Sequence, residues 1–345
     1  MSVVAASVLA ATLAQAGNDE KRGQAGFGQL LMNPWSRSSG MAGANTANIR
    51  GVESMNFNVG GLSQIQKTEF VFSNTTWLQG SDTRINALGF AQSVGGGSGV
   101  IGISVMAVNL GNLYETTVDQ PEGTGRTFSP QIFNGAFAYS RIFSNSISGG
   151  ITLRVVNEST PNINATGVLF DAGVQYKTGE REEFKFGVAL RNVGPNVSYR
   201  GEGLTFRGNS PGARFQNSVT QKSASLQMPS LLNIGASYDI NTLSTDHNLT
   251  VSANFQSHTY TYDQIQGGVE YRFRSYAALR AGIAYYQNVF SNITDRTDVH
   301  RPFTGGFSLQ LPIGEEKLGK VALDYSYRSS NPFGGTHSIG LTVTL

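Results

Sequence analysis

The last quarter of the chain alternates between apolar and polar side chains with a period of two residues. Over 265–273 the odd positions are mostly apolar, whereas the even positions include Glu270 and Arg272. The same alternation returns over 279–286, 320–328 and 338–345. Successive side chains of a β-strand point to opposite faces of the sheet. The pattern therefore predicts strands with one apolar face and one face that carries charge.

The length of these segments separates two kinds of β-protein. A soluble sandwich also has a dry and a wet face, but its strands usually have about five or six residues. The alternating segments here have about ten residues, and about 9–11 tilted residues cross a bilayer. Such strands are typical of a transmembrane β-barrel with lipid outside and a polar lumen inside.

The region 68–345 is predicted to be an all-β domain, an antiparallel transmembrane barrel of about 14 strands. Links after odd-numbered strands are mostly long, such as 113–127 and 196–225, and links after even-numbered strands are mostly short. Bacterial outer-membrane barrels have this asymmetry, with long outer loops and short periplasmic turns. The predicted strands are 68–79, 83–94, 99–112, 128–142, 146–158, 166–178, 183–195, 226–240, 248–258, 262–274, 275–288, 301–312, 319–329 and 336–345.

Two segments precede the predicted barrel. Residues 1–16 are apolar and end in an A-x-A cleavage signal, which predicts a signal peptide. Residues 17–67 are rich in glycine and show no period of two. Irregular backbone cannot lie in lipid, so we expect this segment in the periplasm or folded inside the barrel as a plug. Trp35 and Met41 are expected inside the barrel or at its periplasmic mouth.

Composition and motifs argue against an enzyme and against a cofactor. A net charge of +2 does not suggest nucleic acid, and the absence of cysteine removes disulfides and thiolate metal sites. The G-x-G-x-x-G match at 97–102 opens a strand rather than a helix. The G-x-S-x-G match at 208–212 has Pro211 after the serine, where a backbone N–H is needed. The four histidines are scattered, without metal-ligand spacing. We therefore expect no catalytic, cofactor-binding or metal-binding residues.

Charged residues on the predicted lumen face have two interpretations. Glu270, Arg272, Arg280 and Asp324 lie on strands that face one lumen. Opposite charges can pair across strands and rigidify a barrel, or they can select ions. We favour structural pairing.

The long link 196–225 is the main candidate for binding a partner. Structureless loops of this length are uncommon and often functional. Aromatic residues and arginine are enriched at protein interfaces. The alternative is a solvated lid. The candidate residues are Arg200, Phe206, Arg207, Arg214 and Phe215.

Three short motifs resemble the PorV/PorQ family, outer-membrane proteins of Bacteroidota that are distantly similar to the FadL fatty-acid transporters. The first is SRSSGMAGA at 36–44 followed by NVGGL at 58–62, with Asn58, Gly61 and Leu62 as the matching plug residues. The others are MPSLLNIGASY at 228–238 and NPFGGTHS at 331–338. Val59 and Gly60 stand where this family usually has Pro and Ala.

The resemblance implies a fourteen-stranded barrel with an N-terminal plug in the outer membrane of a Gram-negative bacterium. It also implies a component of the type IX secretion system. Its partners would be outer-membrane lipid, translocon or attachment-complex proteins, and the C-terminal signal domains of secreted cargo. The FadL-like alternative is a channel for hydrophobic small molecules, which would need an apolar pocket between plug and wall.

The alternation predicts that arginine at Val269 or Leu323 impairs membrane insertion, because a lipid-facing arginine near the midplane costs about 2–4 kcal/mol. Arginine at Gly268 or Ser326, on the other face, should do less damage. A heat-modifiability gel measures the folded fraction, and equal damage at all four positions would contradict the assigned faces.

Overall fold

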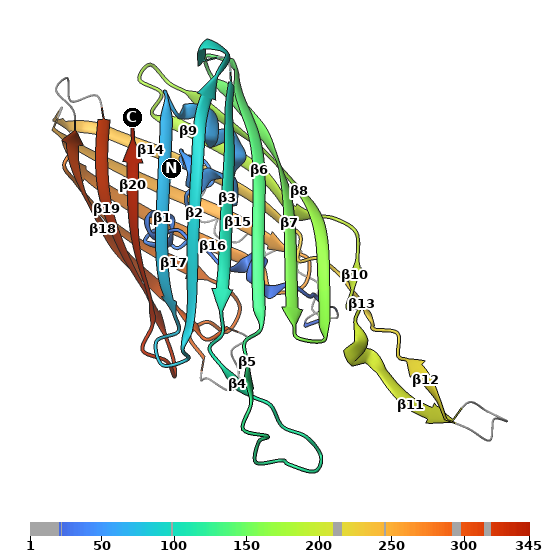
Figure 1. Ribbon diagram of the computed structural model, residues 1–345. Helices are drawn as coiled ribbons and strands as arrows, with labels where there is room; N and C mark the ends of the chain where they lie inside the picture. The colour runs from blue at the N-terminus through green and yellow to red at the C-terminus, as the bar shows by residue number, and fades with distance from the viewer. Residues whose placement is uncertain are drawn as a thin grey trace, which may run out of the picture.

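Fourteen strands form a closed antiparallel barrel in the computed structural model, which describes residues 21, 23–97, 99–209, 216–244, 246–291, 298–313 and 319–345 (Figure 1). The barrel closes where β1 pairs with β20, for example Glu69 with Thr344. The wall strands are β1 (Thr68–Trp77), β2 (Thr83–Val94), β3 (Gly99–Asn109), β6 (Gln131–Ser144), β7 (Ile147–Thr160), β8 (Ile163–Thr178), β9 (Phe184–Val193), β14 (Leu231–Ser244), β15 (His247–His258), β16 (Gln264–Phe273), β17 (Ala277–Tyr285), β18 (His300–Ile313), β19 (Gly319–Ser330) and β20 (Thr336–Thr344).

Each predicted strand corresponds to one wall strand, so the fold class is confirmed. Most boundaries differ by a few residues, and three of the links between strands change markedly. A turn at 274–276, where Arg274 has a φ of 48°, separates β16 from β17, although the alternation ran without a break there. The predicted link 241–247 shrinks to 245–246, and the predicted link 159–165 shrinks to 161–162, because the flanking strands continue toward each other.

The two ends of the barrel differ in their connections. At the end where β20 finishes, all links are short; we call this the short-turn end. The opposite, long-loop end carries the connection between β3 and β6 and the connection between β9 and β14 (Figure 1). This asymmetry is the one expected of an outer-membrane barrel.

The outer face of the wall is apolar. Val269 and Leu323 are 41% and 46% exposed, whereas lumen-facing Ser326 is 2% exposed. Aromatic and aliphatic residues are exposed at alternating positions of the wall strands, among them Phe70, Phe72, Leu88, Phe90, Phe137, Ile151, Phe170, Phe186, Leu279, Phe303 and Leu341. In water such a surface would be unfavourable; facing lipid, it is the surface that a transmembrane barrel needs.

The predicted signal peptide, 1–16, lies outside the described residues, as do 17–20 of the next segment. The rest of that segment contains four short helices: η2 (Gly28–Leu31), α2 (Ser36–Ser39), η3 (Val52–Asn56) and η4 (Val59–Gln64). No helix in the described part of the chain combines the length and the apolar character needed to cross a membrane.

Residues 23–67, the N-terminal segment, lie inside the barrel, and lumen-facing glycines let its backbone approach the wall. A Cβ at Gly187 of β9 would lie 2.5 Å from the Thr46 carbonyl oxygen. A Cβ at Gly282 of β17 would lie 2.7 Å from the Ala42 nitrogen. These are distances that a side chain cannot occupy. The segment therefore fits this wall because the wall lacks side chains at the points of contact.

Apolar packing fixes the segment against one side of the lumen. Trp35, Val52, Met55 and Leu62 are at most 2% exposed and belong to one cluster with lumen-facing residues of β1, β2, β3 and β6. Phe27 and Leu30 join a second cluster, near the long-loop end, with residues of β7 and β8. Trp35 and Met41 are buried as expected. That the segment acts as a plug stays a prediction.

Asn58 ties the N-terminal segment to the wall. Its Oδ1 accepts a hydrogen bond from the Gly60 backbone N–H at 3.1 Å, which caps η4. Its Nδ2 donates to the carbonyl oxygens of Thr46 (3.0 Å) and of Val174 in β8 (2.9 Å). Gly61 has no room for a Cβ beside the Ile49 carbonyl, and Leu62 is fully buried. The family-like motif thus consists of packing and capping residues.

One expectation about the lumen face is wrong. Gly268 faces inward as predicted, but a Cβ there would already lie 3.1 Å from the Met41 Cε and 3.2 Å from its carbonyl oxygen. Arginine at Gly268 would displace the N-terminal segment and is therefore not a mild substitution. Ser326 borders an internal pocket, described below.

We predict that Gly282→Val expels the N-terminal segment while the barrel still forms. Gly267→Val is the matched control, because Gly267 lies on the outer face and a Cβ there meets only Ile283 Cγ2, at 3.5 Å. Limited proteolysis in detergent should cleave residues 23–67 rapidly in the Gly282 variant alone, with heat modifiability retained in both. Equal protection of the segment in both variants would refute this packing.

Candidate functional site in the barrel lumen

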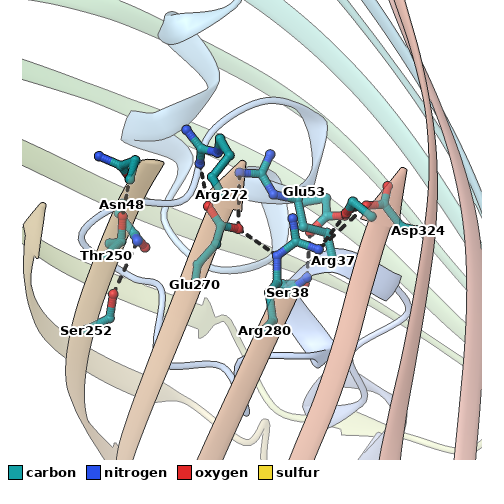
Figure 2. Close-up of polar contacts among 12 residues, drawn as sticks. Arg37, Ser38, Asn48, Glu53, Thr250, Ser252, Glu270, Arg272, Arg280 and Asp324 are labelled. Atoms are coloured by element: carbon teal, nitrogen blue, oxygen red, sulfur yellow. Dashed lines mark hydrogen bonds and ion pairs between the residues drawn. The ribbon is translucent and has the colours of Figure 1, made fainter. Parts of the chain in front are cut away.

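A network of charged side chains lines one side of the lumen near the short-turn end (Figure 2). The Glu270 carboxylate accepts from Arg280 Nε at 2.6 Å and also binds Arg272. Arg280 Nη1 donates to Ser308 Oγ at 2.6 Å and lies 3.7 Å from Asp324 Oδ1. The side chains of Glu270, Arg280 and Asp324 are at most 4% exposed. The four charges predicted to face the lumen thus pair across β16, β17 and β19.

The N-terminal segment takes part in this network. Arg37 Nη2 lies 3.9 Å from Glu270 Oε2, and the Glu53 carboxylate accepts from the Ser38 backbone N–H at 3.0 Å (Figure 2). Glu53 is not on a wall strand. Burial raises the pKa of Glu53 to about 7, against the opposing effect of nearby Arg37. The network holds α2 and η3 to the wall electrostatically.

A second buried ion pair fixes η3 from the opposite wall. Arg154 of β7 pairs with Asp171 of β8 at 2.7 Å, and both side chains are 5% exposed. Arg154 Nη2 also donates to the Met55 carbonyl oxygen at 3.0 Å. Asp171 Oδ1 accepts the backbone N–H of Asn192 at 2.6 Å, next to a bulge between β8 and β9. Both Asp171 oxygens are therefore engaged.

A pocket of about 500 Å³ lies in the other half of the lumen, toward the long-loop end. This volume suits a small organic molecule. The N-terminal segment contributes Asn33, Gly43 and Phe57 to its lining. The wall contributes a mixture of aromatic and polar side chains, including Trp77, Arg191, Leu231, Gln256, His258, Gln264, Gln266, Tyr286 and Arg328.

Amide side chains form a ladder on one wall of this pocket. Gln266 Nε2 donates to Gln256 Oε1 at 3.1 Å and to Gln264 Oε1 at 3.3 Å, and Gln266 Oε1 accepts from Asn254 at 2.8 Å. His258 Nε2 lies 3.1 Å from Gln256 Oε1. These residues alternate along β15 and β16, so their side chains share the lumen face. The ladder gives the pocket fixed hydrogen-bonding groups.

Arg191 closes the same pocket from β9. It lies in one register row with Leu231 of β14 and His258 of β15. Arg191 is 5% exposed, and its guanidinium carbon lies 5.4 Å from the centroid of the Phe57 ring. Among the described residues, its guanidinium has no hydrogen-bond or salt-bridge partner, and its Nε is a buried donor without an acceptor. A buried cation without a partner is costly.

The predicted partner-binding residues are less organised than the sequence suggested. The link between β9 and β14 forms two small ladders, β10 (Val197–Ser198) with β13 (Ser225–Leu226) and β11 (Thr205–Asn209) with β12 (Gln216–Thr220). The latter hairpin projects away from the barrel (Figure 1). The expectation of a structureless loop was therefore wrong, because Gln216–Thr220 pairs with Thr205–Asn209.

The candidate residues of this link do not converge on one surface. Phe206 is 53% exposed, and Arg207, its neighbour on β11, points to the opposite face of the hairpin. Arg200 is exposed at the base, where its backbone pairs with Asn164. Arg214 and Phe215 lie outside the described residues, so their part in binding stays a prediction.

The glycine motif at 97–102 lacks the strand-to-helix turn that a nucleotide site needs. Gly97 ends a glycine turn, and the residues after Ser98 form β3 rather than a helix. Ser210 lies outside the described residues. Across the residues that the structure describes, no group of three or more His, Cys, Asp or Glu side chains is placed to hold a metal ion.

The sequence contained a signal for the pocket that our sequence analysis missed. Gln256 with His258, and Gln264 with Gln266, are uncharged polar pairs at a spacing of two on neighbouring lumen-facing strands. Such repetition marks a polar stripe. The alternation along β9 likewise places Arg191 on the lumen face. Its lack of a partner could not be predicted, because it depends on which residues Asp171 contacts, and those contacts join segments that are distant in sequence.

Comparison with known proteins gives a match at the level of the fold. No protein-family model matches the chain, and no curated protein does. Among solved structures, the chain is similar to the CymD monoaromatic hydrocarbon channel, with a TM-score of 0.55, 12% identity, and coverage of 89% of this chain and 95% of that one. For the Ralstonia pickettii toluene transporter TbuX, the TM-score is 0.54 and the identity 13%, and the match covers 93% of this chain and 98% of that one. For a Pseudomonas aeruginosa FadL homologue, the TM-score is 0.51 and the identity 12%, and the match covers 89% of this chain and 96% of that one.

These neighbours support the FadL-like part of the resemblance as a statement about fold. None of them bears on the PorV/PorQ branch or on type IX secretion, which stay predictions.

We predict that Glu270→Ala lowers the free energy of unfolding by about 3–5 kcal/mol, because it removes the carboxylate that Arg280 binds at 2.6 Å and leaves this buried arginine with only Asp324, 3.7 Å away. Arg274→Ala should change it far less, since the Arg274–Asp246 pair at 2.8 Å is exposed to solvent. Urea titration in detergent micelles, followed by tryptophan fluorescence, compares the two. Equal losses would show that the network contributes no more than an exposed ion pair.

Proposed function

We propose that this protein is a non-enzymatic outer-membrane channel for small hydrophobic or amphipathic molecules. The observation that carries the proposal is the pocket of about 500 Å³ inside a closed barrel whose fold is that of hydrocarbon channels. The pocket lies between the N-terminal segment and the wall, where a solute entering from the long-loop end would first be held. Its surroundings would be outer-membrane lipid.

The lining narrows the class of solute. The channel interpretation predicts an apolar pocket with few polar groups. A pocket does lie between the N-terminal segment and the wall, but many of its lining side chains are polar. Aromatic surfaces of Phe57, Trp77 and Tyr286 alternate with the amide ladder and Arg191. A fully apolar solute would leave the buried Arg191 guanidinium without a partner, which is unfavourable. We therefore favour solutes with both a flat apolar part and a polar group.

Cargo binding for type IX secretion is the second candidate. The observation in its favour is the β11–β12 hairpin, which projects beyond the barrel with Phe206 exposed (Figure 1). Exposed aromatic residues often anchor protein partners. The opposed faces of Phe206 and Arg207 and the fold-level neighbours make this the weaker proposal.

Filling the pocket tests the channel. Leu231→Trp adds bulk at a lumen-facing position that is 2% exposed, and Leu232→Trp places the same bulk on the outer face, where Leu232 is 37% exposed. In a Gram-negative strain without its own channel of this fold, the Leu231 variant should take up radiolabelled benzyl alcohol, which has a ring and a hydroxyl, several-fold more slowly than the wild type. The Leu232 variant should match the wild type.

A third variant separates the two candidates. Deletion of 205–220 removes the hairpin without touching the pocket. Normal uptake by this variant, with unchanged co-purification of other proteins from outer membranes, supports the channel. Loss of a co-purifying secretion component or cargo protein, together with no uptake by the wild type, would favour secretion.

A further inference from the structure

Arg191 carries a positive charge into the pocket that nearby side chains do not neutralise. Asp171 is close enough to interact with it electrostatically. However, Asp171 already pairs with Arg154 at 2.7 Å and accepts the Asn192 N–H at 2.6 Å. Two arginines thus share one carboxylate, which leaves one positive charge in excess. Arg191 is 5% exposed, so bulk water does not compensate for this charge.

The other charged groups of the pocket are committed elsewhere. Asp298 lies 3.0 Å from His300 Nδ1 and 3.9 Å from Arg328 Nη2. The Asp263 carboxylate accepts the His258 backbone N–H at 3.0 Å. The excess charge at Arg191 therefore calls for one negative charge from a ligand.

We propose that the pocket binds an organic monocarboxylate with a flat, ring-shaped apolar part, and that Arg191 pairs with its carboxylate. This deepens the proposed channel function by naming the solute class. A guanidinium presents two parallel N–H donors that match a carboxylate, and a single excess charge suits a monoanion better than a phosphate dianion. Phe57 under the guanidinium, with Trp77 and Tyr286 in the lining, provides ring faces for the apolar part.

The probes are benzoate, toluene and acetate, which separate the carboxylate from the ring. Binding to the purified full-length chain in detergent is measured by calorimetry in a chloride-free buffer. We expect benzoate to bind at least about tenfold more tightly than toluene and than acetate, since a charge-assisted hydrogen bond at a buried site is worth about that factor or more. Benzoate that binds no better than acetate would overturn the role of the rings.

Arg191→Met removes the charge and keeps an apolar chain of similar length. It should fold at least as well as the wild type on a heat-modifiability gel, because it removes an unpaired buried charge. Its affinity for benzoate should fall about 10- to 100-fold, with affinity for toluene unchanged. The control is Arg126→Met, which removes an exposed arginine of the link between β3 and β6, outside the pocket; it should keep benzoate affinity within about threefold.

A preference for benzoate over toluene that survives in Arg191→Met would overturn the proposal. The channel function fails separately. If the wild-type chain binds benzoate in an Arg191-dependent way but cells take up neither benzoate nor toluene, the anion site stands and the channel falls. If toluene enters cells and benzoate does not bind, the channel stands and the anion site falls.

Discussion

The structure depends on closure of one hydrogen-bonded ladder. In lipid, an unpaired backbone N–H or C=O costs several kcal/mol, so a sheet can cross a membrane only if its first and last strands meet. Here β1 and β20 pair from Glu69↔Thr344 to Thr76↔His337. Closure assigns one face of every strand to lipid and the other to an enclosed lumen. The pocket and the projecting hairpin accordingly lie in the lumen and in a loop.

The lumen is divided between a rigid half and a half with free space. Toward the short-turn end, Glu270, Arg280 and Asp324 satisfy one another and hold α2 and η3 in place. Toward the long-loop end, the same wall has amides and Arg191 around a pocket. The paired charges thus lie in the packed half of the lumen, near the short-turn end. The unpaired charge of Arg191 lies in the half that contains the pocket. This division is what we expect if the first half supports the structure and the second half receives a solute.

The fold was predictable because its main signal is local. Alternation along ten residues reports the two faces of a strand, and this located all fourteen wall strands. The predicted strand boundaries were wrong where the alternation continued from one strand into the next. At Arg274, a left-handed turn residue ends β16, although the sequence pattern shows no break there. The β11–β12 hairpin was missed for the opposite reason. It lies outside lipid and lumen, so its residues show no strict alternation of apolar and polar side chains.

The pocket was not predictable in the same way, because its defining property is an absence of pairing. The parity of Arg191 on β9 indicates that it faces the lumen, as does that of Arg154 on β7. Which of the two arginines binds Asp171 is decided by the packing of three strands and η3, since the Met55 carbonyl draws Arg154 toward the pair. Arg191 is left to stack on Phe57, the residue before Asn58. Because Asn58 fastens the N-terminal segment to β8, the floor of the pocket and the tether of that segment are one continuous structure. A ligand that pairs with Arg191 would therefore lie close to Phe57, the neighbour of the residue that ties the N-terminal segment to the wall.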